Sequence, residues 1–340
     1  MSPGVAHDND GELPSRIPMP TKTFAFIHPI TPERLQPFQA AAPDVEFLVP
    51  GESPLPVGLE RADAAAISWG GPPIDDILAA APRLRWLHQR GAGIDRIATP
   101  RLVDSDVVVT NGSGNHAPNI AEHLLALMLA FARQLPALIR SQQNALWEPP
   151  ASSRLFELSE QTLAIVGAGA IGSALAPRAA ALGMTVIGVR RSAAATPPAG
   201  IERIVTIDRI DEALGVADHV AIALPLTAET RGLFSTALIA KMKPGAYLYN
   251  VGRGPILDPA ALLDALRTGH LAGAGLDVTE PEPLPADSPL WREPGVIITA
   301  HSSGNTPRSY ERYERLLLDN LGRWVRGDAL LNVVDKRLGY

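Results

Sequence analysis

A G-x-G-x-x-G motif at residues 167–172 constrains the fold of this chain more than any other feature. It lies between an apolar run, Leu163 to Val166, and an Ala-rich stretch, Ser173 to Leu182, which predicts a strand, a tight turn and a helix. In that context the first glycine permits the turn, the second lets the backbone approach a pyrophosphate, and the third allows the helix to pack closely on the strand. The motif predicts dinucleotide binding, although a tight packing turn alone could use the same glycines. The expected cofactor contacts here are Gly167, Gly169, Ala170, Ile171 and Gly172.

Short β-rich runs alternate with helix-length segments along most of the chain. The first set of runs comprises Thr23 to His28, Val45 to Val49, Ala64 to Trp69, Leu84 to Gln89 and Val107 to Thr110. The second set comprises residues 163–167, 185–190, 219–225, 246–251, 273–278 and 295–301. Such alternation predicts parallel sheets. We therefore expect an α/β fold with two Rossmann-like, doubly wound parallel-sheet domains.

A long apolar segment, residues 119–135, separates the two sets and is predicted to be a helix that links two domains. Residues 309–324 carry apolar side chains at helical spacing and are expected to pack back on the first domain. The nucleotide domain, residues 119–303, is then inserted into a discontinuous substrate domain. That substrate domain is formed by residues 21–118 and 304–340.

Composition excludes several classes of protein. The 340 residues are 46% hydrophobic, which is enough for two cores, and the absence of Cys excludes disulfides, Cys-ligated metals and thiolate nucleophiles. A net charge of -6 without a dense Lys/Arg run argues against nucleic acid as a partner. Residues 1–20, rich in Pro, Gly, Asp and Asn, are expected to be a mobile leader. Since no signal-peptide core or membrane-length apolar stretch is found, we expect a cytoplasmic protein with no membrane partner.

The strand expected at residues 185–190 ends in Arg190, followed by Arg191. At this distance from the glycine motif, about twenty residues, an NAD site usually carries an acid that binds the ribose hydroxyls. A carboxylate would repel a 2′-phosphate, whereas a guanidinium pairs with it, so NADPH is favoured over NADH. The alternative is that both arginines are a solvated strand end, or that Arg190 stacks on adenine without selecting the cofactor.

Three polar side chains follow expected strands in the second half of the chain: Arg253, Glu282 and His301. Ligands of such folds bind beyond the carboxyl ends of the strands, so these side chains could converge. Glu280 competes with Glu282, because both precede Pro and spacing alone does not separate them.

The chain resembles the D-isomer-specific 2-hydroxyacid dehydrogenases over residues 60–335. Besides the glycine motif, the matching pieces are Gly252-Arg253-Gly254, Leu276-Asp277-Val278, Glu282-Pro283-Leu284, His301, Gly91-Ala92-Gly93-Ile94-Asp95, Ala121-Glu122-His123, and Leu224-Pro225-Leu226-Thr227 with Thr230. Within the family it is most similar to the glyoxylate/hydroxypyruvate reductase A group, through Trp69 and the Pro pair after it, residues 143–147 and the ending 334–340.

The resemblance implies a role for each matching residue. It makes His301 the acid/base, Glu282 its partner and Arg253 the substrate clamp, and it selects Glu282 over Glu280. It also implies substrate contacts at Ala92, Gly93 and Arg253, and cofactor contacts at Leu224, Pro225, Thr230, Val251 and Asp277, the last near the nicotinamide carboxamide. Trp69 is expected to contact the substrate as part of the pocket wall, although a lone Trp at a strand end could equally belong to the core.

Physical chemistry agrees with these roles. Hydride addition to a ketone builds negative charge on oxygen, so a proton donor is needed, and histidine titrates nearest to neutrality. A carboxylate beside His301 favours the charged imidazolium and orients the ring. Arg253 can hold the substrate carboxylate and polarise the carbonyl, with backbone N–H groups around Ala92 and Gly93 as further donors.

We therefore expect NAD(P)H-dependent reduction of a small 2-keto acid, of glyoxylate or hydroxypyruvate type, to the D-2-hydroxy acid. The resemblance further implies a homodimer, and no metal site is predicted. The alternatives are a family dehydrogenase for a bulkier keto acid and a nucleotide-sensing binding protein similar to corepressors.

Three features leave the substrate range open. Ala300 stands where the family usually has Pro, and Ser302-Ser303 follow His301 where an apolar residue is common. Arg90, just before Gly91, either contacts a second carboxylate or polar substituent of the substrate or pairs with a helix C-terminus.

Overall fold

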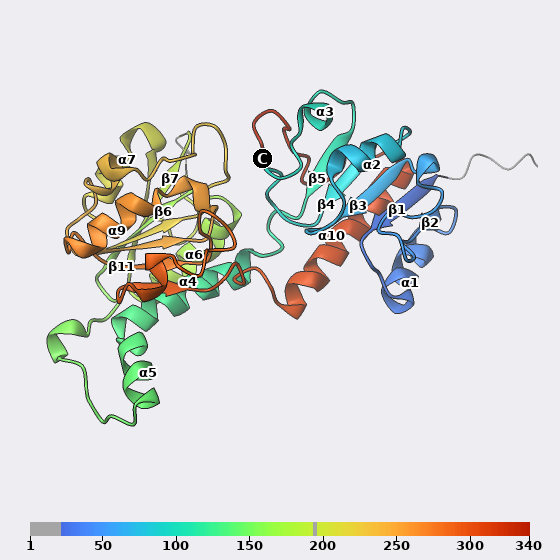
Figure 1. The fold of residues 1–340 in the computed structure, drawn as a ribbon. Helices are drawn as coiled ribbons and strands as arrows, with labels where there is room; N and C mark the ends of the chain where they lie inside the picture. Colours follow the sequence, from blue (N-terminus) through green and yellow to red (C-terminus); the bar gives the residue numbers. More distant parts are fainter. Residues whose placement is uncertain (1–21, 193–195) are drawn as a thin grey trace, which may run out of the picture.

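The computed structural model describes residues 22–192 and 196–340. Its strands form two separate parallel sheets, one with five strands and one with seven, and helices pack around each sheet (Figure 1). This confirms the predicted α/β class with two Rossmann-like parallel-sheet domains. The expected leader, residues 1–20, lies outside the described residues.

The five-stranded sheet has the order β2-β1-β3-β4-β5. Its strands are β1 (Thr23–Ile27), β2 (Glu46–Leu48), β3 (Ala64–Ile67), β4 (Trp86–Gln89) and β5 (Val108–Asn111), and the helices between them are α1 (Pro32–Ala41), α2 (Ile74–Ala80) and α3 (Pro100–Val103). Every residue of β1, β3 and β4 is buried. Strands covered on both faces are expected to be buried throughout, as in other parallel sheets.

The seven-stranded sheet has the order β12-β11-β10-β9-β6-β7-β8. Its strands are β6 (Thr162–Val166), β7 (Thr185–Arg190), β8 (Arg203–Thr206), β9 (His219–Ile222), β10 (Ala246–Asn250), β11 (Leu271–Leu276) and β12 (Val296–Ile298). From β6 the chain builds outward to β8 and then returns to place β9 on the other side of β6. Ligands of such sheets bind at the crevice where the order reverses. The edge strand β8 was not predicted.

Four helices accompany this second sheet: α6 (Ala170–Ala181), α7 (Ile210–Leu214), α8 (Thr236–Ile239) and α9 (Pro259–Arg267). Before them come α4 (Ala117–Ala132) and α5 (Leu135–Gln143). The helix predicted at residues 119–135 is α4, which ends earlier because Gln134 adopts a left-handed backbone with φ 53°. The inner face of α4 packs on α6 and on the second sheet.

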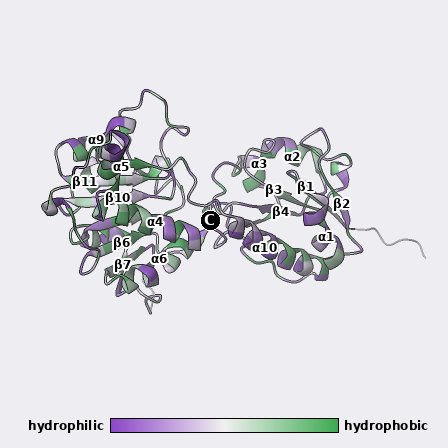
Figure 2. Ribbon diagram, turned by 90° about the horizontal axis from the view of Figure 1, so that it is seen from below, coloured by the Kyte–Doolittle hydropathy of each residue, from purple (hydrophilic) through white to green (hydrophobic). Residues whose placement is uncertain are grey.

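The helix α10 (Pro307–Arg326) returns the chain to the first sheet, as predicted (Figure 1). Its buried side chains Tyr313, Leu317 and Leu321 share one apolar cluster with Phe24 and Trp86. Figure 2 shows both hydrophilic and hydrophobic residues along α10, as expected for a helix with one buried face. We propose domain boundaries at 118/119 and 303/304, because the chain crosses between the units near these positions.

Among the described residues, no single helix is long and apolar enough to cross a membrane. Helices α4 and α5 reach the required length and composition only as a pair, and that pair is bent by 69°.

Candidate active site

A cavity of ≈ 760 Å³ lies between the two units and is lined by residues from both. The first unit contributes the loop that follows β4, including Arg90, and Trp69 after β3. The second unit contributes residues that follow β6, β9, β10, β11 and β12. The cavity therefore opens at the carboxyl ends of both sheets, where ligands of parallel α/β folds bind.

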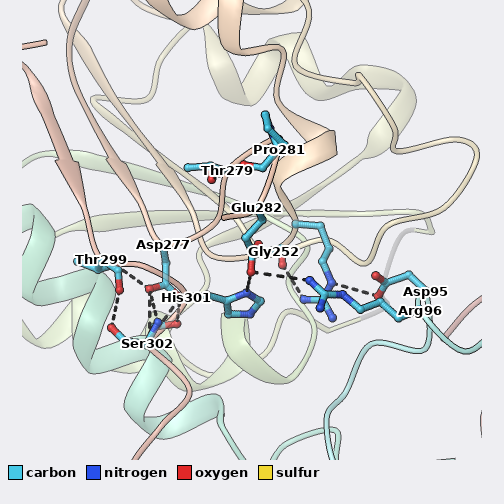
Figure 3. Close-up of polar contacts among 12 residues, drawn as sticks. Asp95, Arg96, Gly252, Asp277, Thr279, Pro281, Glu282, Thr299, His301 and Ser302 are labelled. Carbon is cyan, nitrogen blue, oxygen red and sulfur yellow. Dashed lines mark hydrogen bonds and ion pairs between the residues drawn. The ribbon is translucent and has the colours of Figure 1, made fainter. Parts of the chain in front are cut away.

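His301 and Glu282 meet at this cavity. The ring Nδ1 of His301 lies 2.7 Å from Oε1 of Glu282, and both side chains are partly exposed (Figure 3). Glu280, two residues before Glu282, is exposed and takes no part in this contact. If Nδ1–H donates to the carboxylate, Nε2 is the ring nitrogen left to exchange a proton with a ligand.

The loop that carries His301 is held by Asp277, at the end of β11. The buried carboxylate of Asp277 accepts a hydrogen bond from the Thr299 hydroxyl at 2.7 Å and from the backbone N–H of Ser302 at 2.9 Å. The N–H and hydroxyl of Ser303 also donate to it. Asp277 does not line the cavity, so it positions the His301 loop from behind.

This loop also accounts for the residues that differ from the usual family pattern. Ala300 and His301 have φ angles of 49° and 53°, in the left-handed region. A proline at residue 300 could not adopt that backbone, since its ring holds φ near −65°. An apolar residue in place of Ser303 would remove a hydroxyl that donates to Asp277.

Arg253, just after β10, is oriented by a residue of the other unit. Its Nε donates to Oδ1 of Asp95 at 3.1 Å, and its Nη1 donates to the carbonyl of Gly252 at 2.8 Å. Gly93 is necessary for this approach, because a Cβ there would collide with the Arg253 guanidinium. Asp95 had no predicted role, because no local sequence pattern pairs two residues 158 positions apart.

Trp69 connects these groups at the cavity wall. Its ring lies 5.1 Å from the ring of His301, centre to centre, in an edge-to-face arrangement. The guanidinium of Arg96 lies 4.5 Å from the Trp69 ring centre. Arg96 also approaches Glu282 Oε1 at 3.8 Å (Figure 3). Arg96 was not identified from the sequence.

Ala92 and Gly93, the other expected substrate contacts, line the cavity. The Ala92 carbonyl accepts a hydrogen bond from Asn111 at 2.6 Å, which fixes this turn. Within the described part of the chain, the N–H groups of Ala92 and Gly93 have no acceptor. These two donors are therefore available to an anionic ligand.

The glycine motif has the shape that a dinucleotide requires. Gly167 has φ 102°, and a Cβ there would lie 2.6 Å from the carbonyl oxygen of Ala223. A Cβ on Gly172 would lie 2.9 Å from a methyl group of Ile165, so this glycine permits close packing of α6 on β6. At Gly169 a Cβ would meet no atom within 4 Å, and this residue lines the cavity at the start of α6. The motif thus leaves room for a pyrophosphate at a helix N-terminus.

The remaining expected cofactor residues fall into two groups. Those that line the cavity are Ala170, Ile171, Leu224, Pro225 and Val251. Those that do not line it are Gly167, Gly172, Arg190, Arg191, Thr230 and Asp277. Thr230 shapes the wall instead, since its hydroxyl donates to the Pro225 carbonyl at 2.7 Å.

Arg190 lies beside the glycine turn, where its Nε donates to the Ala168 carbonyl at 2.7 Å. Arg191 pairs with Glu229 at 3.3 Å and lies over the Tyr340 ring at 5.1 Å. Over residues 22–192 and 196–340, no three or more His, Asp or Glu side chains are grouped to hold a metal ion.

Sequence comparison connects this geometry to known proteins. The family model described as D-isomer specific 2-hydroxyacid dehydrogenase, NAD binding domain, matches residues 125–303. D-3-phosphoglycerate dehydrogenase of Mycobacterium tuberculosis is 35% identical over 265 residues, which are 77% of this chain and 49% of that protein. Glyoxylate reductase of Korarchaeum cryptofilum is 32% identical over 273 residues, 78% of this chain and 81% of that protein. The chain spans about half the length of the phosphoglycerate dehydrogenases it matches.

Solved structures are similar over nearly the whole chain. One is a D-isomer specific 2-hydroxyacid dehydrogenase from Xanthobacter autotrophicus Py2 in complex with NADPH and MES, with a TM-score of 0.80 and 31% identity. The match covers 94% of this chain and 100% of the Xanthobacter chain. An NADPH-dependent glyoxylate/hydroxypyruvate reductase from Sinorhizobium meliloti, in complex with NADP and sulfate, has a TM-score of 0.79 and 29% identity with the same coverage.

Proposed function

Because the chain belongs to the D-isomer specific 2-hydroxyacid dehydrogenase family, we propose that it reduces a small 2-keto acid, of glyoxylate or hydroxypyruvate type, to the D-2-hydroxy acid. The observation that carries this proposal is the 2.7 Å contact between His301 and Glu282 in a cavity that Arg253 also lines. The glyoxylate and hydroxypyruvate reductases among the similar proteins support the substrate class.

The proposed chemistry divides between His301 and Glu282. A bound reduced nicotinamide supplies the hydride for the carbonyl carbon. As negative charge builds on the carbonyl oxygen, His301 donates a proton from Nε2, so that C=O becomes CH–OH and the imidazole is left neutral. Glu282 stabilises the charged imidazolium before the transfer and holds the ring in place through Nδ1. Solvent then returns a proton to His301.

Arg253 is the proposed clamp for the substrate carboxylate. A guanidinium binds a carboxylate through two parallel hydrogen bonds, and Asp95 already fixes its Nε side. The N–H groups of Ala92 and Gly93, in the loop that lies against the Arg253 guanidinium, supply two further donors. With the carboxylate held by these groups together, the carbonyl carbon is positioned before the reaction begins.

The test is a panel of 2-keto acids with NADPH and NADH, applied to the native chain and to His301→Ala. We expect turnover of glyoxylate or hydroxypyruvate, and a loss of roughly 10²- to 10⁴-fold in kcat for His301→Ala. The affinity for NADPH, followed by its fluorescence, should stay unchanged in this variant. No turnover of any acid with either cofactor would overturn the proposal.

We further propose that NADPH is preferred over NADH. Arg190 is held beside the glycine turn by its bond to Ala168, and its guanidinium carries donors that a 2′-phosphate requires. The Xanthobacter and Sinorhizobium proteins were solved with NADPH and NADP. Arg190→Asp should lower NADPH affinity by roughly 10- to 100-fold and change NADH affinity far less. An unchanged ratio of the two affinities would contradict the assignment.

A homodimer is the proposed assembly, formed around α5. This helix has no buried residue and extends away from the second sheet (Figure 1). Apolar side chains on and after it are exposed, with Ile139 at 51%, Leu146 at 50% and Trp147 at 99%. Light scattering of the purified chain should give twice its mass, and a monomer at micromolar concentration would exclude this assembly.

A further inference from the structure

We propose that Arg90 binds a second anionic group of the substrate. The best substrates of this site would then be 2-keto acids that carry a carboxylate or phosphate beyond the carbonyl carbon. Glyoxylate would be a minimal substrate that fills only the reacting part of the cavity. This inference rests on the proposed function and concerns the same site.

The first argument is the charge balance of the cavity wall. The charged side chains that line the cavity, apart from the histidines His116 and His301, are Arg90, Asp95, Arg96, Arg253 and Glu282. Asp95 pairs with Arg253, and Glu282 pairs with Arg96 and His301. For the chain as described, from residue 22 on and without 193–195, Arg90 has no carboxylate partner and its guanidinium donates no hydrogen bond. Of the three arginines on the wall, Arg90 is therefore the one without an acidic partner among the described residues.

The second argument is that Arg90 is already held in place. Its backbone N–H donates to the carbonyl of Ile67 at 3.0 Å, at the end of the central strands of the first sheet. Its guanidinium carbon lies 3.8 Å from the ring centre of Tyr310, a residue of α10 that also lines the cavity. Stacking on an aromatic ring covers one face of a guanidinium and leaves its edge donors free. A side chain held in this way loses little further entropy when it binds an anion.

The third argument is the position of Arg90 in the chain. It immediately precedes Gly91, and the same loop contains Ala92 and Gly93, whose N–H groups are available to the first carboxylate. Arg253 and His301 line the same cavity from the second unit, and the Arg253 guanidinium lies against Gly93. A substrate whose first carboxylate is held at this loop could extend a substituent at its far end along the first unit, where Arg90 has no carboxylate partner among the described residues.

The experiment compares glyoxylate with three acids that carry a second anionic group, using the native chain and Arg90→Gln. Oxaloacetate and 2-ketoglutarate test a carboxylate, and 3-phosphohydroxypyruvate tests a phosphate. We expect the native chain to have a higher kcat/KM for at least one of these acids than for glyoxylate. Arg90→Gln should lower that value by roughly 10- to 100-fold and change the glyoxylate value by less than about 2-fold. Whichever acid loses most identifies the group that Arg90 binds.

A matched control separates binding from a structural role. Arg34 lies 5.9 Å from the same Tyr310 ring, but it pairs with Glu314 and does not line the cavity. Arg34→Gln should leave all four substrates unchanged. Malonate, a dianion that cannot be reduced, should inhibit glyoxylate reduction less strongly in Arg90→Gln than in the native chain, whereas inhibition by acetate should not change.

The outcomes that overturn the inference differ from those that overturn the proposed function. Equal losses for glyoxylate and the dianionic acids in Arg90→Gln, or a native preference for glyoxylate over all three, would assign Arg90 to packing on Tyr310 and leave the reductase proposal intact. If the native chain turns over none of the four acids and does not turn over hydroxypyruvate either, both proposals fail.

Discussion

The two sheets resemble one another in architecture and differ in the side chains carried by the loops at their carboxyl ends. The seven-stranded sheet carries the proposed catalytic side chains Arg253, Glu282 and His301 on three neighbouring loops. The five-stranded sheet carries groups that hold those side chains, among them Asp95 and Arg96. The difference implies that neither unit has a complete site by itself, and that the first unit would contribute to the proposed reaction by orienting these side chains and by holding the substrate.

A substitution at Glu282 tests whether the second unit carries the catalytic groups. Glu282→Gln removes the charge that stabilises the imidazolium of His301, so kcat should fall by roughly 10- to 100-fold. Glu280→Gln is the matched control, because it makes the same change two residues earlier on an exposed side chain and should stay within about 2-fold. Steady-state kinetics on both variants distinguishes them, and equal losses would show that the 2.7 Å contact with His301 is not decisive.

A substitution at Asp95 tests whether the first unit orients those catalytic groups. Asp95→Asn keeps the shape of the side chain and weakens its bond to Arg253, so we expect KM to rise by roughly 3- to 30-fold with a smaller change in kcat. Asp104→Asn alters an acid that pairs with Arg337 on the surface and should have no such effect. If Asp95→Asn lowered kcat and left KM unchanged, Asp95 would belong with the catalytic groups and the division between the units would be wrong.

A smaller effect concerns stability, because each sheet buries a histidine on a strand. Burial lowers the pKa of His88 on β4 to about 3 and that of His219 on β9 to about 4, from 6.5. As the pH falls, the histidines of the unfolded chain therefore bind protons before those of the folded chain. The contribution of the buried neutral histidines to the free energy of unfolding is fully present above pH 6.5 and is lost toward pH 4. For His219 this loss in the free energy of unfolding should reach about 3 kcal/mol.

The two histidines differ in their hydrogen bonds. His219 contacts Tyr249 at 3.0 Å through Nδ1 and also contacts Gln161 through Nε2, whereas Nε2 of His88 has no partner among the described residues. Urea denaturation at pH 7 and pH 4.5 should show a smaller acid-dependent loss for His219→Gln than for the native chain. Parallel losses in the two proteins would mean that His219 is not the group that titrates.

Local patterns in the sequence were sufficient for most of the fold. Apolar runs and the glycine motif predicted two parallel sheets, because strand periodicity and turn residues are local properties. Strand β8 was missed, since four residues at a sheet edge, beginning with the exposed Arg203, leave too short an apolar signal. The start of α6 at Ala170, inside the glycine motif, also precedes the predicted start at Ser173.

The site was less predictable because its contacts join distant parts of the chain. The resemblance indicated Arg253, Glu282 and His301, but only the structure brings Asp95 to Arg253. Asp277 was expected near the nicotinamide carboxamide, which stays a prediction, and the structure adds that its carboxylate accepts bonds from the His301 loop. Residue types alone do not tell whether an acid faces a ligand or supports the loop behind it.

The two crossings between the units lie next to each other. On the outgoing side, Asn119 at the start of α4 donates to the carbonyl of Ser303 on the returning side at 2.7 Å, and His116 contacts the carbonyl of Gly304 at 2.8 Å. The entry and exit points of the nucleotide unit are thus already joined in space. A module with adjacent ends can be transplanted through two nearby junctions. A chimera that exchanged residues 119–303 with a relative would therefore change the proposed cofactor and catalytic loops together, and leave the first unit's own loops, including Arg90, in their native setting.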